Sequence, residues 1–259
     1  LSQVEAEEAN LLDVFLSTGL ASSHPRIQYA AALAVGRLGR ESLMPQVIEM
    51  LERNPDLDPL LRHAGIKALV GQPSLERLAA LAVHPSASVR LAAVVALRKR
   101  QSDKIAKFLE DDTEAVVMEA VRAIHDLPAL HGQLDRIAGL ITGGSRSETI
   151  LRRVLNANFR LGQAEHAVAL ARFAADSTRA STMRLEALAM LGEWPKPGVY
   201  DRVMHRYEPL PTRPMTDAAA ALERKLTTLL GSENELREKT RQVAVALNIS
   251  TIARALVAV

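Results

Sequence analysis

A helical pattern of small and apolar residues recurs along this chain at intervals of roughly 30 residues. Three strong copies start at Ile27, Leu61 and Val89, and fainter copies start at Val116, Leu151, Met183 and Leu236. A fixed period of this size is typical of stacked repeats, each of which buries its apolar side only against its neighbours. We therefore expect a repeat array rather than a globule with one central core.

Each copy predicts a helix with one buried face. In the third copy, Val89, Ala92, Ala93, Ala96 and Leu97 follow the i, i+3, i+4, i+7, i+8 spacing of such a face. The middle of the face is small in five of the seven copies and larger in the other two: Ala31, Gly65, Ala93, Ala120 and Ala187, against Leu155 and Thr240. Small residues there let neighbouring helices approach closely. With aromatics at only 3% of the chain, the composition favours helices over strands.

A turn and a partner helix complete each unit. The turns His24-Pro25, Asp58-Pro59 and His84-Pro85 precede the strong copies, and proline fits the first turn of a helix. The partner helices, which lie between copies of the pattern, are expected over 42–52, 74–83, 103–110, 129–141 and 163–175. The predicted fold is all-α: an α-solenoid of about seven helical hairpins. We expect one domain over residues 1–259, and we interpret the chain as a fragment of a longer protein.

An insertion is expected at about 192–214, before the last repeat. It holds five of the 12 prolines and the aromatic residues Trp194, Tyr200 and Tyr207. Proline at this density favours extended backbone. Insertions in repeat arrays often carry a binding face. The alternative is that Trp194 and Tyr200 cover an apolar seam between repeats.

The pattern resembles the second helix of HEAT repeats: apolar, Arg, two variable residues, a small residue, then Ala and an apolar residue after a turn with Asp or Pro. Most copies carry the arginine, as Arg62, Arg90, Arg152, Arg184 and Arg237, whereas Gln28 and Val117 depart from the pattern. The resemblance implies that these arginines form a structural ladder, tying successive turns through carboxylates and carbonyls. Val117 would then break the ladder in the fourth repeat.

A narrower resemblance covers most of the chain in short, repetitive pieces. The stretches 58–65, 88–93, 119–126, 155–162 and 183–203 are similar to the HEAT segment of planctomycete and verrucomicrobial-type membrane-bound dehydrogenase or c-type haem-binding-domain proteins. The resemblance implies a sugar-dehydrogenase-like β-propeller before the repeats and a cytochrome c domain after them. It also implies an extracytoplasmic location, and it assigns no catalytic residue to this chain.

The concave face of a HEAT array is lined by the second helices, whose third and seventh positions should point outward. This surface mixes apolar and charged residues, which suits a protein partner better than a phosphate backbone. Leu91 and Val95 could instead pack between repeats. The candidate partner-binding residues are Tyr29, His63, Leu91, Met118, Arg122, Arg153, Trp194, Tyr200 and Tyr207.

Catalytic and metal chemistry find little support in the sequence. There is no cysteine, which excludes thiolate metal sites and haem attachment within this chain. None of the seven histidines is followed by Glu, so the His-Glu pairs of HEAT-type di-iron hydroxylases are missing. Gly143-Gly144 lacks the Lys of a phosphate loop and predicts a turn. We expect no catalytic residue, no cofactor and no metal in this chain.

The function predicted from the sequence is a non-catalytic scaffold that holds a protein partner or neighbouring domains of its own chain. The alternative is nucleic-acid binding of the HEAT-like DNA-glycosylase kind. The net charge of +2 is too small to argue for nucleic acid on its own, although residues 61–259 carry 28 basic and 21 acidic side chains. Arg98-Lys99-Arg100 closes a helix, where cations are favoured without DNA. A third option is a HEAT-type lyase acting on a chromophore-bearing protein. No apolar run reaches the ~18 residues that span a bilayer.

Overall fold

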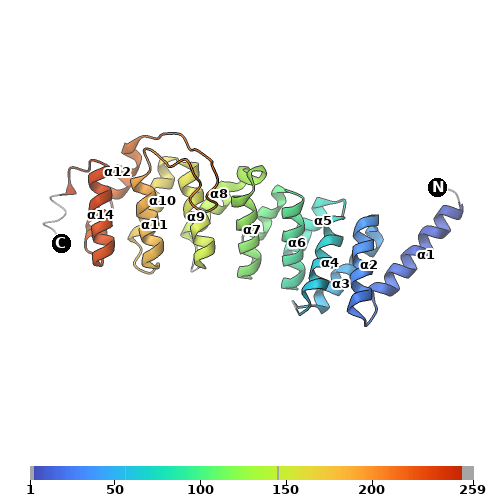
Figure 1. Cartoon of the computed structure of the whole chain (residues 1–259). Helices are drawn as coiled ribbons and strands as arrows, with labels where there is room; N and C mark the ends of the chain where they lie inside the picture. The colour runs from blue at the N-terminus through green and yellow to red at the C-terminus, as the bar shows by residue number, and fades with distance from the viewer. Residues whose placement is uncertain (1–2, 56, 145, 253–259) are drawn as a thin grey trace. The chain divides into compact units, whose positions relative to one another are not determined.

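The computed structural model describes residues 3–55, 57–144 and 146–252, and in these ranges the chain is all-α (Figure 1). The helices form two compact units, Leu1–Leu130 and His131–Val259. Within each unit, helices pair into hairpins that stack on the next hairpin in the chain. The predicted all-α helical-repeat fold is therefore confirmed.

The first unit contains four hairpins. Its elements are α1 (Gln3–Leu20), α2 (Pro25–Leu38), η1 (Glu41–Leu43), α3 (Met44–Arg53), α4 (Pro59–Val70), α5 (Leu75–Ala80), η2 (Leu81–Val83), α6 (Ala87–Lys99), η3 (Asp103–Phe108) and α7 (Glu114–Asp126), where η marks a 3₁₀ helix. The pairs are α1–α2, α3–α4, α5–α6 and η3–α7. The second helices form one layer, because α2 packs on α4, α4 on α6 and α6 on α7.

A short 3₁₀ segment, η4 (Pro128–Gln133), spans the boundary between the two units. The second unit contains three hairpins. Its elements are α8 (Leu134–Ala138), η5 (Gly139–Thr142), α9 (Glu148–Leu161), α10 (Ala164–Ala175), α11 (Ser181–Gly192), α12 (Met215–Glu223), α13 (Leu226–Leu230) and α14 (Asn234–Ala246). Here α8 and η5 pair with α9, α10 with α11, and α12 and α13 with α14, while α11 packs on both α9 and α14.

The seven copies of the sequence pattern lie in α2, α4, α6, α7, α9, α11 and α14, one in each hairpin. The middle position is buried in all seven, including the two larger residues Leu155 and Thr240. Burial of Thr240 is tolerated because its hydroxyl donates to the carbonyl of Leu236, 2.7 Å away. The pattern therefore marks the layer of helices that stack from repeat to repeat.

Glycine allows close packing at two points in the first unit. A Cβ added to Gly65 on α4 would lie 2.5 Å from Cδ2 of Leu51 on α3. A Cβ on Gly36 of α2 would lie 2.8 Å from the Cα of Ala68, and one on Gly71 would collide with the carbonyl of Gly36. The helices α2 and α4 therefore touch main chain to main chain near their C-terminal ends.

Helix ends agree with the proline turns at two of three sites. Pro25 and Pro59 each occupy the first position of a helix, and Asp58 caps α4 by accepting the amide N–H of Leu60 at 2.8 Å. The third turn differs, since α6 begins at Ala87 and Pro85 lies before its cap residue.

Two of the expected partner helices, those between copies of the pattern, are not regular α-helices. Residues 103–108 form the 3₁₀ helix η3, in which Ile105 and Phe108 are buried three residues apart, as a 3₁₀ turn allows. The span 129–141 is divided among η4, α8 and η5, with Gly132 and Gly139 at the breaks. Glycine has a low helix propensity, so Gly132 and Gly139 disfavour a continuous α-helix over the second stretch.

In the first unit, Arg90 forms a rung of the expected arginine ladder. Nε and Nη2 of Arg90 donate to the carboxylate of Asp111 at 2.7 and 3.0 Å, and Nη1 donates to the carbonyl of His84 at 2.8 Å. Arg90 thereby ties the turn before α6 to the turn before α7. Its pKa is raised, chiefly by the hydrogen bond to Asp111. Arg62 occupies the same place on α4 and is half-buried.

The other rungs differ from one another. Arg184 is buried and joins the carbonyl of Ala174 to the hydroxyl of Ser232 in the next repeat, whereas Arg237 bonds the carbonyls of Leu230 and Ser232 within its own hairpin. Arg152 does not take the place in the ladder that the sequence predicted. It is exposed and pairs with Glu148 one turn earlier in α9, so it ties no repeat to another.

Candidate partner-binding surface

A groove runs along the junction of α2 and α4. One hollow of about 360 Å³ is lined by Tyr29, Leu33, Gly36, Arg37, His63, Lys67, Val70 and Gly71. A second hollow of about 690 Å³ is lined by His24, Pro25, Arg26, Tyr29, Asp58 and Leu60. Because Tyr29 lines both, the two hollows form one surface, which we call the α2–α4 groove.

The groove residues come from the outward stripe of each helix. On α2, Tyr29, Leu33 and Arg37 are four residues apart, and on α4 His63 and Lys67 have the same spacing, so each set lies on one helix face. Tyr29, Leu33, His63 and Lys67 are the third and seventh positions of the sequence pattern, and Arg37 lies one turn further along α2. The structure thus brings the candidates Tyr29 and His63 together, and it adds Arg37 and Lys67 beside them.

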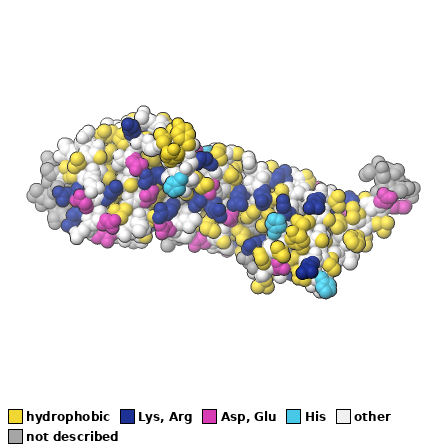
Figure 2. All heavy atoms as spheres, viewed as in Figure 1, with side chains coloured by type: hydrophobic (Ala, Val, Ile, Leu, Met, Phe, Trp, Pro, Cys, Tyr) yellow, Lys and Arg dark blue, Asp and Glu magenta, His cyan; other side chains and the backbone are white. Residues whose placement is uncertain are grey.

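The groove is apolar with basic margins. Leu60 near its N-terminal end is 64% exposed, so water meets a large aliphatic side chain there. Figure 2 shows hydrophobic, basic and histidine side chains mixed over α2 and α4, at the right of the view. Exposed apolar surface rimmed by polar groups is typical of interaction sites.

The surface continues over α6 and α7 with a different character. The candidates Leu91 and Met118 are half-buried, as is Val95, so these side chains partly fill the space between neighbouring helices. The candidate Arg122 is paired with Glu119 at 3.0 Å, and Glu119 also accepts from Arg98 at 2.8 Å. One carboxylate therefore offsets two of the cations on this part of the layer.

The segment 193–214 between α11 and α12, which we call the strap, corresponds to the expected insertion. Trp194 at its start is fully buried, with its ring edge-on to Phe159 at 6.1 Å. The guanidinium of Arg213 at its other end lies 5.0 Å from the Phe159 ring. This corrects Trp194 as a partner-binding candidate, because the indole is enclosed within the second unit and fills a seam.

Tyr200 and Tyr207 occupy the outer part of the strap and are 61% and 67% exposed. They form an isolated antiparallel bridge, flanked by hydrogen bonds from the amide of Asp201 to the carbonyl of Arg206 (2.8 Å) and from Glu208 to Val199 (2.9 Å). Their rings meet edge to face at 6.0 Å. The pair is a preformed aromatic patch.

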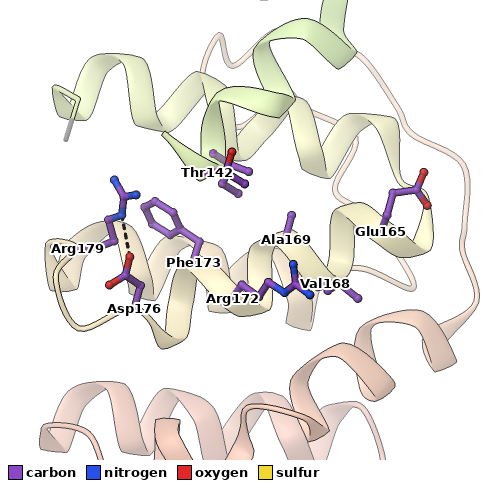
Figure 3. Close-up of a pocket in the computed structure, with 9 residues that line it drawn as sticks. Thr142, Glu165, Val168, Ala169, Arg172, Phe173, Asp176 and Arg179 are labelled. Carbon is purple, nitrogen blue, oxygen red and sulfur yellow. Dashed lines mark hydrogen bonds and ion pairs between the residues drawn. The ribbon is translucent and has the colours of Figure 1, made fainter. Parts of the chain in front are cut away.

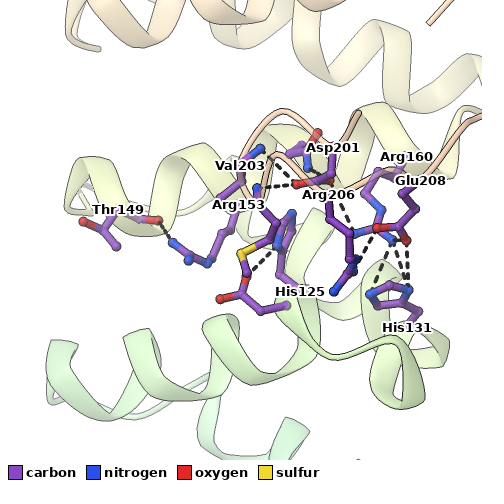
Figure 4. A network of polar contacts seen from close by, with 12 residues as sticks. His125, His131, Thr149, Arg153, Arg160, Asp201, Val203, Arg206 and Glu208 are labelled. Carbon is purple, nitrogen blue, oxygen red and sulfur yellow. Dashed lines mark hydrogen bonds and ion pairs between the residues drawn. The ribbon is translucent and has the colours of Figure 1, made fainter. Parts of the chain in front are cut away.

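A buried polar network fixes this patch to α9 (Figure 4). Asp201 is only 6% exposed, and one of its carboxylate oxygens accepts from Nδ2 of Asn156 at 2.6 Å. The other accepts the amides of Val203 and Met204 at 2.9 and 2.6 Å, which closes the turn of the strap. Arg160 lies 3.6 Å from Asp201. Sequence reasoning missed this network, although Asn156, a polar residue within the largely apolar stretch 154–159, was a visible signal.

Arg160 also links the strap to the start of the second unit. It pairs with Glu208, and its Nη2 lies 3.0 Å from Nδ1 of His131. Arg206 reaches the same Glu208 carboxylate at 2.9 Å. The candidate Arg153 is half-buried on α9, and its Nη1 lies 3.3 Å from the carbonyl of Thr149.

A further hollow of about 420 Å³ lies along α10 (Figure 3). Its floor includes Val168, Ala169 and Phe173, and its ends carry Glu165 on one side and Arg179 with Asp176 on the other. Arg179 is occupied: it pairs with Asp176 at 3.1 Å and donates to the carbonyl of Gly143 at 2.6 Å. Charges of both signs balance here, so the hollow has no marked preference for ligands of either charge.

The described residues contain no cluster of three or more His, Cys, Asp or Glu side chains that could hold a metal ion. No described helix combines the length and apolar character needed to cross a membrane.

The folded hairpins place the chain in the class of all-α helical-repeat proteins. No protein-family model and no curated protein matches the sequence. Among solved structures, an engineered protein is similar with a TM-score of 0.47 and 16% identity, over 94% of this chain and 70% of that one. A designed armadillo repeat protein in complex with the peptide (KR)4 has a TM-score of 0.43 and 16% identity, over 90% and 98%.

Human deoxyhypusine hydroxylase in complex with glycerol is a more distant likeness, with a TM-score of 0.35, 15% identity and coverage of 90% and 83%. At these values the similarities carry nothing about binding or catalysis to this chain. The resemblance to dehydrogenase and cytochrome-associated repeats stays an expectation.

Proposed function

We propose that this chain is a non-catalytic interaction module that holds an extended segment of a protein partner in the α2–α4 groove. The observation that carries the proposal is the groove itself: two hollows sharing Tyr29, with aliphatic side chains and basic groups along one helix junction. A central aromatic anchor in an apolar site is the feature that dominates binding energy in protein interfaces.

The dimensions of the groove suit an extended peptide. Helix α2 has 14 residues, which at ~1.5 Å per residue gives a length of about 20 Å. An extended chain rises about 3.3 Å per residue, so about six residues of a partner would follow the groove from end to end. Alternate side chains of such a segment would face the two helices.

Nucleic-acid binding is the alternative, and the charges of the first unit support it less well. A phosphate track needs several unpaired cations in register. On α6 and α7, Arg98 and Arg122 share the carboxylate of Glu119, and Arg100 donates to the carbonyl of Gln72 at 2.7 Å. These three cations next to the α2–α4 groove are therefore already bound by groups of the protein.

Selection from a random peptide library displayed on phage tests the proposal. We expect the full chain to retain peptides whose binding is lost in Tyr29→Ala and kept in Lys107→Ala, a change on the exposed side of η3. In parallel, filter binding to duplex DNA is measured at two salt concentrations. Tight DNA binding that falls steeply with salt, without any peptide that depends on Tyr29, would favour the alternative.

The finer proposal concerns the setting of the module. Following the family resemblance, its neighbours would be a propeller dehydrogenase and a cytochrome c domain of one larger protein. Reading the complete gene tests this: a Cys-x-x-Cys-His motif downstream or a propeller upstream supports it, and unrelated neighbours contradict it.

A further inference from the structure

We infer that the segment bound by the α2–α4 groove is acidic, with carboxylates interspersed among apolar side chains. The inference rests on the proposed function and adds the chemistry of the partner. It follows from three observations. These are the charges that line the groove, the absence of ion pairs at its described cations, and the apolar groups that lie between them.

Basic groups lie at both ends of the groove. Arg37 and Lys67 line the hollow at the C-terminal end, and Arg26 and His24 line the other. Among the described residues, none of the three cations Arg26, Arg37 and Lys67 forms an ion pair. They are therefore available to a ligand, in contrast to Arg98 and Arg122 on the neighbouring helices.

Among the described residues, Asp58 is the one carboxylate that lines either hollow. Its Oδ1 accepts the amides of Leu60 at 2.8 Å and Leu61 at 3.3 Å as the cap of α4, which fixes the carboxylate but leaves its negative charge. The three cations therefore outnumber the lining carboxylate, and the excess of positive charge is greatest at the C-terminal end, where Arg37 and Lys67 lie. An acidic ligand is attracted there, and like-charge contacts are a recognised means of rejecting a basic one.

The middle of the groove selects against a ligand that is only a polyanion. Tyr29 and Leu33 on α2 face Val70 on α4, so the centre offers an aromatic ring and aliphatic groups. A phosphate backbone gains little there, whereas leucine or aromatic side chains of a peptide bury apolar surface. The combination of free cations at the ends and apolar groups between them points to an acidic peptide rather than nucleic acid.

Three fluorescein-labelled peptides of about eight residues, long enough to span the groove, test the inference. In each, leucine and tyrosine alternate with one polar residue, which is glutamate, glutamine or lysine. Binding to the full chain is measured by fluorescence anisotropy at about 50 and about 300 mM salt. We expect the glutamate peptide to bind at least about tenfold more tightly than the lysine peptide at low salt, and the difference to shrink at high salt.

Charge reversal in the groove supplies the second arm. Lys67→Glu should weaken binding of the glutamate peptide by about three- to tenfold and strengthen binding of the lysine peptide, because the change removes a surface attraction and adds a repulsion. Lys107→Glu carries the same change of net charge outside the groove and should leave both affinities within about twofold. In a competition measurement, unlabelled duplex DNA about as long as the peptides is added to displace the labelled glutamate peptide.

The outcomes separate the two proposals. If the glutamine or lysine peptide binds as tightly as the glutamate peptide and still requires Tyr29, the groove is a peptide site of other specificity: the inference fails and the proposed function stands. Displacement of the glutamate peptide by DNA at lower concentration than by unlabelled peptide overturns the inference in favour of nucleic acid. If no peptide of the series depends on Tyr29, the inference fails, and the library selection decides the proposed function independently.

Discussion

The guanidinium carbon of Arg213 lies 4.7 Å from the centre of the Trp194 indole ring, so the two ends of the strap meet in one stack. The terminal nitrogens of Arg213 are buried and have no hydrogen-bond partner, and burial lowers the pKa of this guanidinium. Stacking on aromatic faces is therefore the interaction that holds the charge in place. Closure of the strap depends on this stack and on the Asp201 network.

Trp194→Ala should reduce the free energy of unfolding by about 3 kcal/mol or more, because it leaves a large cavity against Phe159. Urea denaturation followed by far-ultraviolet circular dichroism measures it, since the only tryptophan is lost. The matched control is Tyr200→Ala, which removes an exposed ring of the same strap and should cost well under about 1 kcal/mol. Equal losses for the two variants would contradict the buried-seam role.

Arg213→Lys should destabilise the second unit by about 1–2 kcal/mol. Lysine keeps the charge but lacks the planar group that stacks on Trp194, and its ammonium would be desolvated without a partner. A double-mutant cycle with Trp194→Ala should give a coupling of about 0.5–2 kcal/mol. Additive losses would show that the stack contributes nothing.

Arg90→Met should cost about 3–5 kcal/mol, because it strands the carboxylate of Asp111, whose side chain is only 2% exposed. Arg152→Met changes the same position of the pattern on α9. Its pair with Glu148 is exposed, so the expected loss is at most about 0.5 kcal/mol. Similar losses at the two positions, measured by denaturant unfolding, would mean that the ladder is not concentrated at Arg90.

Gly65→Ala should destabilise the first unit by about 1–3 kcal/mol through overpacking, since the added methyl would lie 2.5 Å from Cδ2 of the buried Leu51. In a chain that already carries Leu51→Ala, the Gly65→Ala substitution should cost less free energy of unfolding, because the smaller side chain frees the space. A double variant less stable than the sum of the two single variants would contradict the contact.

We expect the protein to lose stability in mild acid because of His166. Its pKa is lowered, first by burial, and its Nδ1 accepts the amide N–H of Gln163 in the cap of α10. Protonation is thus easier in the unfolded chain. Stability should be complete above the unfolded pKa of about 6.5 and fall as pH drops toward the folded value. His166→Gln should flatten this part of a Tm-against-pH profile, and an unchanged slope would contradict the assignment.

The sequence predicted the layer of stacked helices well, because one buried face per repeat is a local pattern. It also located the ends of the irregular segment, where proline excludes helix. It did not predict the Asp201 network, since Asn156 and Asp201 are brought together only when the strap folds back across α9. The rings of Trp194 and Tyr200 are close in sequence, yet one is buried and the other exposed. Composition alone cannot distinguish them.

The surface residues were predicted in part. Tyr29 and His63 were chosen from their positions on the pattern, and the structure places both in the α2–α4 groove. Arg122 was chosen in the same way, but its charge is shared with Glu119, which follows from a packing of α6 on α7 that periodicity does not reveal. The peptide-binding role of Tyr29, and that of the exposed pair Tyr200 and Tyr207, stays a prediction.

The contact between Gly36 and Gly71 limits how this molecule can be re-engineered. At that end of the groove the separation of α2 and α4 is set by main chain alone, so no choice of side chain can bring the helices closer, and any added methyl pushes them apart. Attempts to accommodate bulkier or slimmer ligands would have to vary the opposite end, around Pro25 and Leu60. The glycine contact would keep the spacing of the two helices constant while those changes are made.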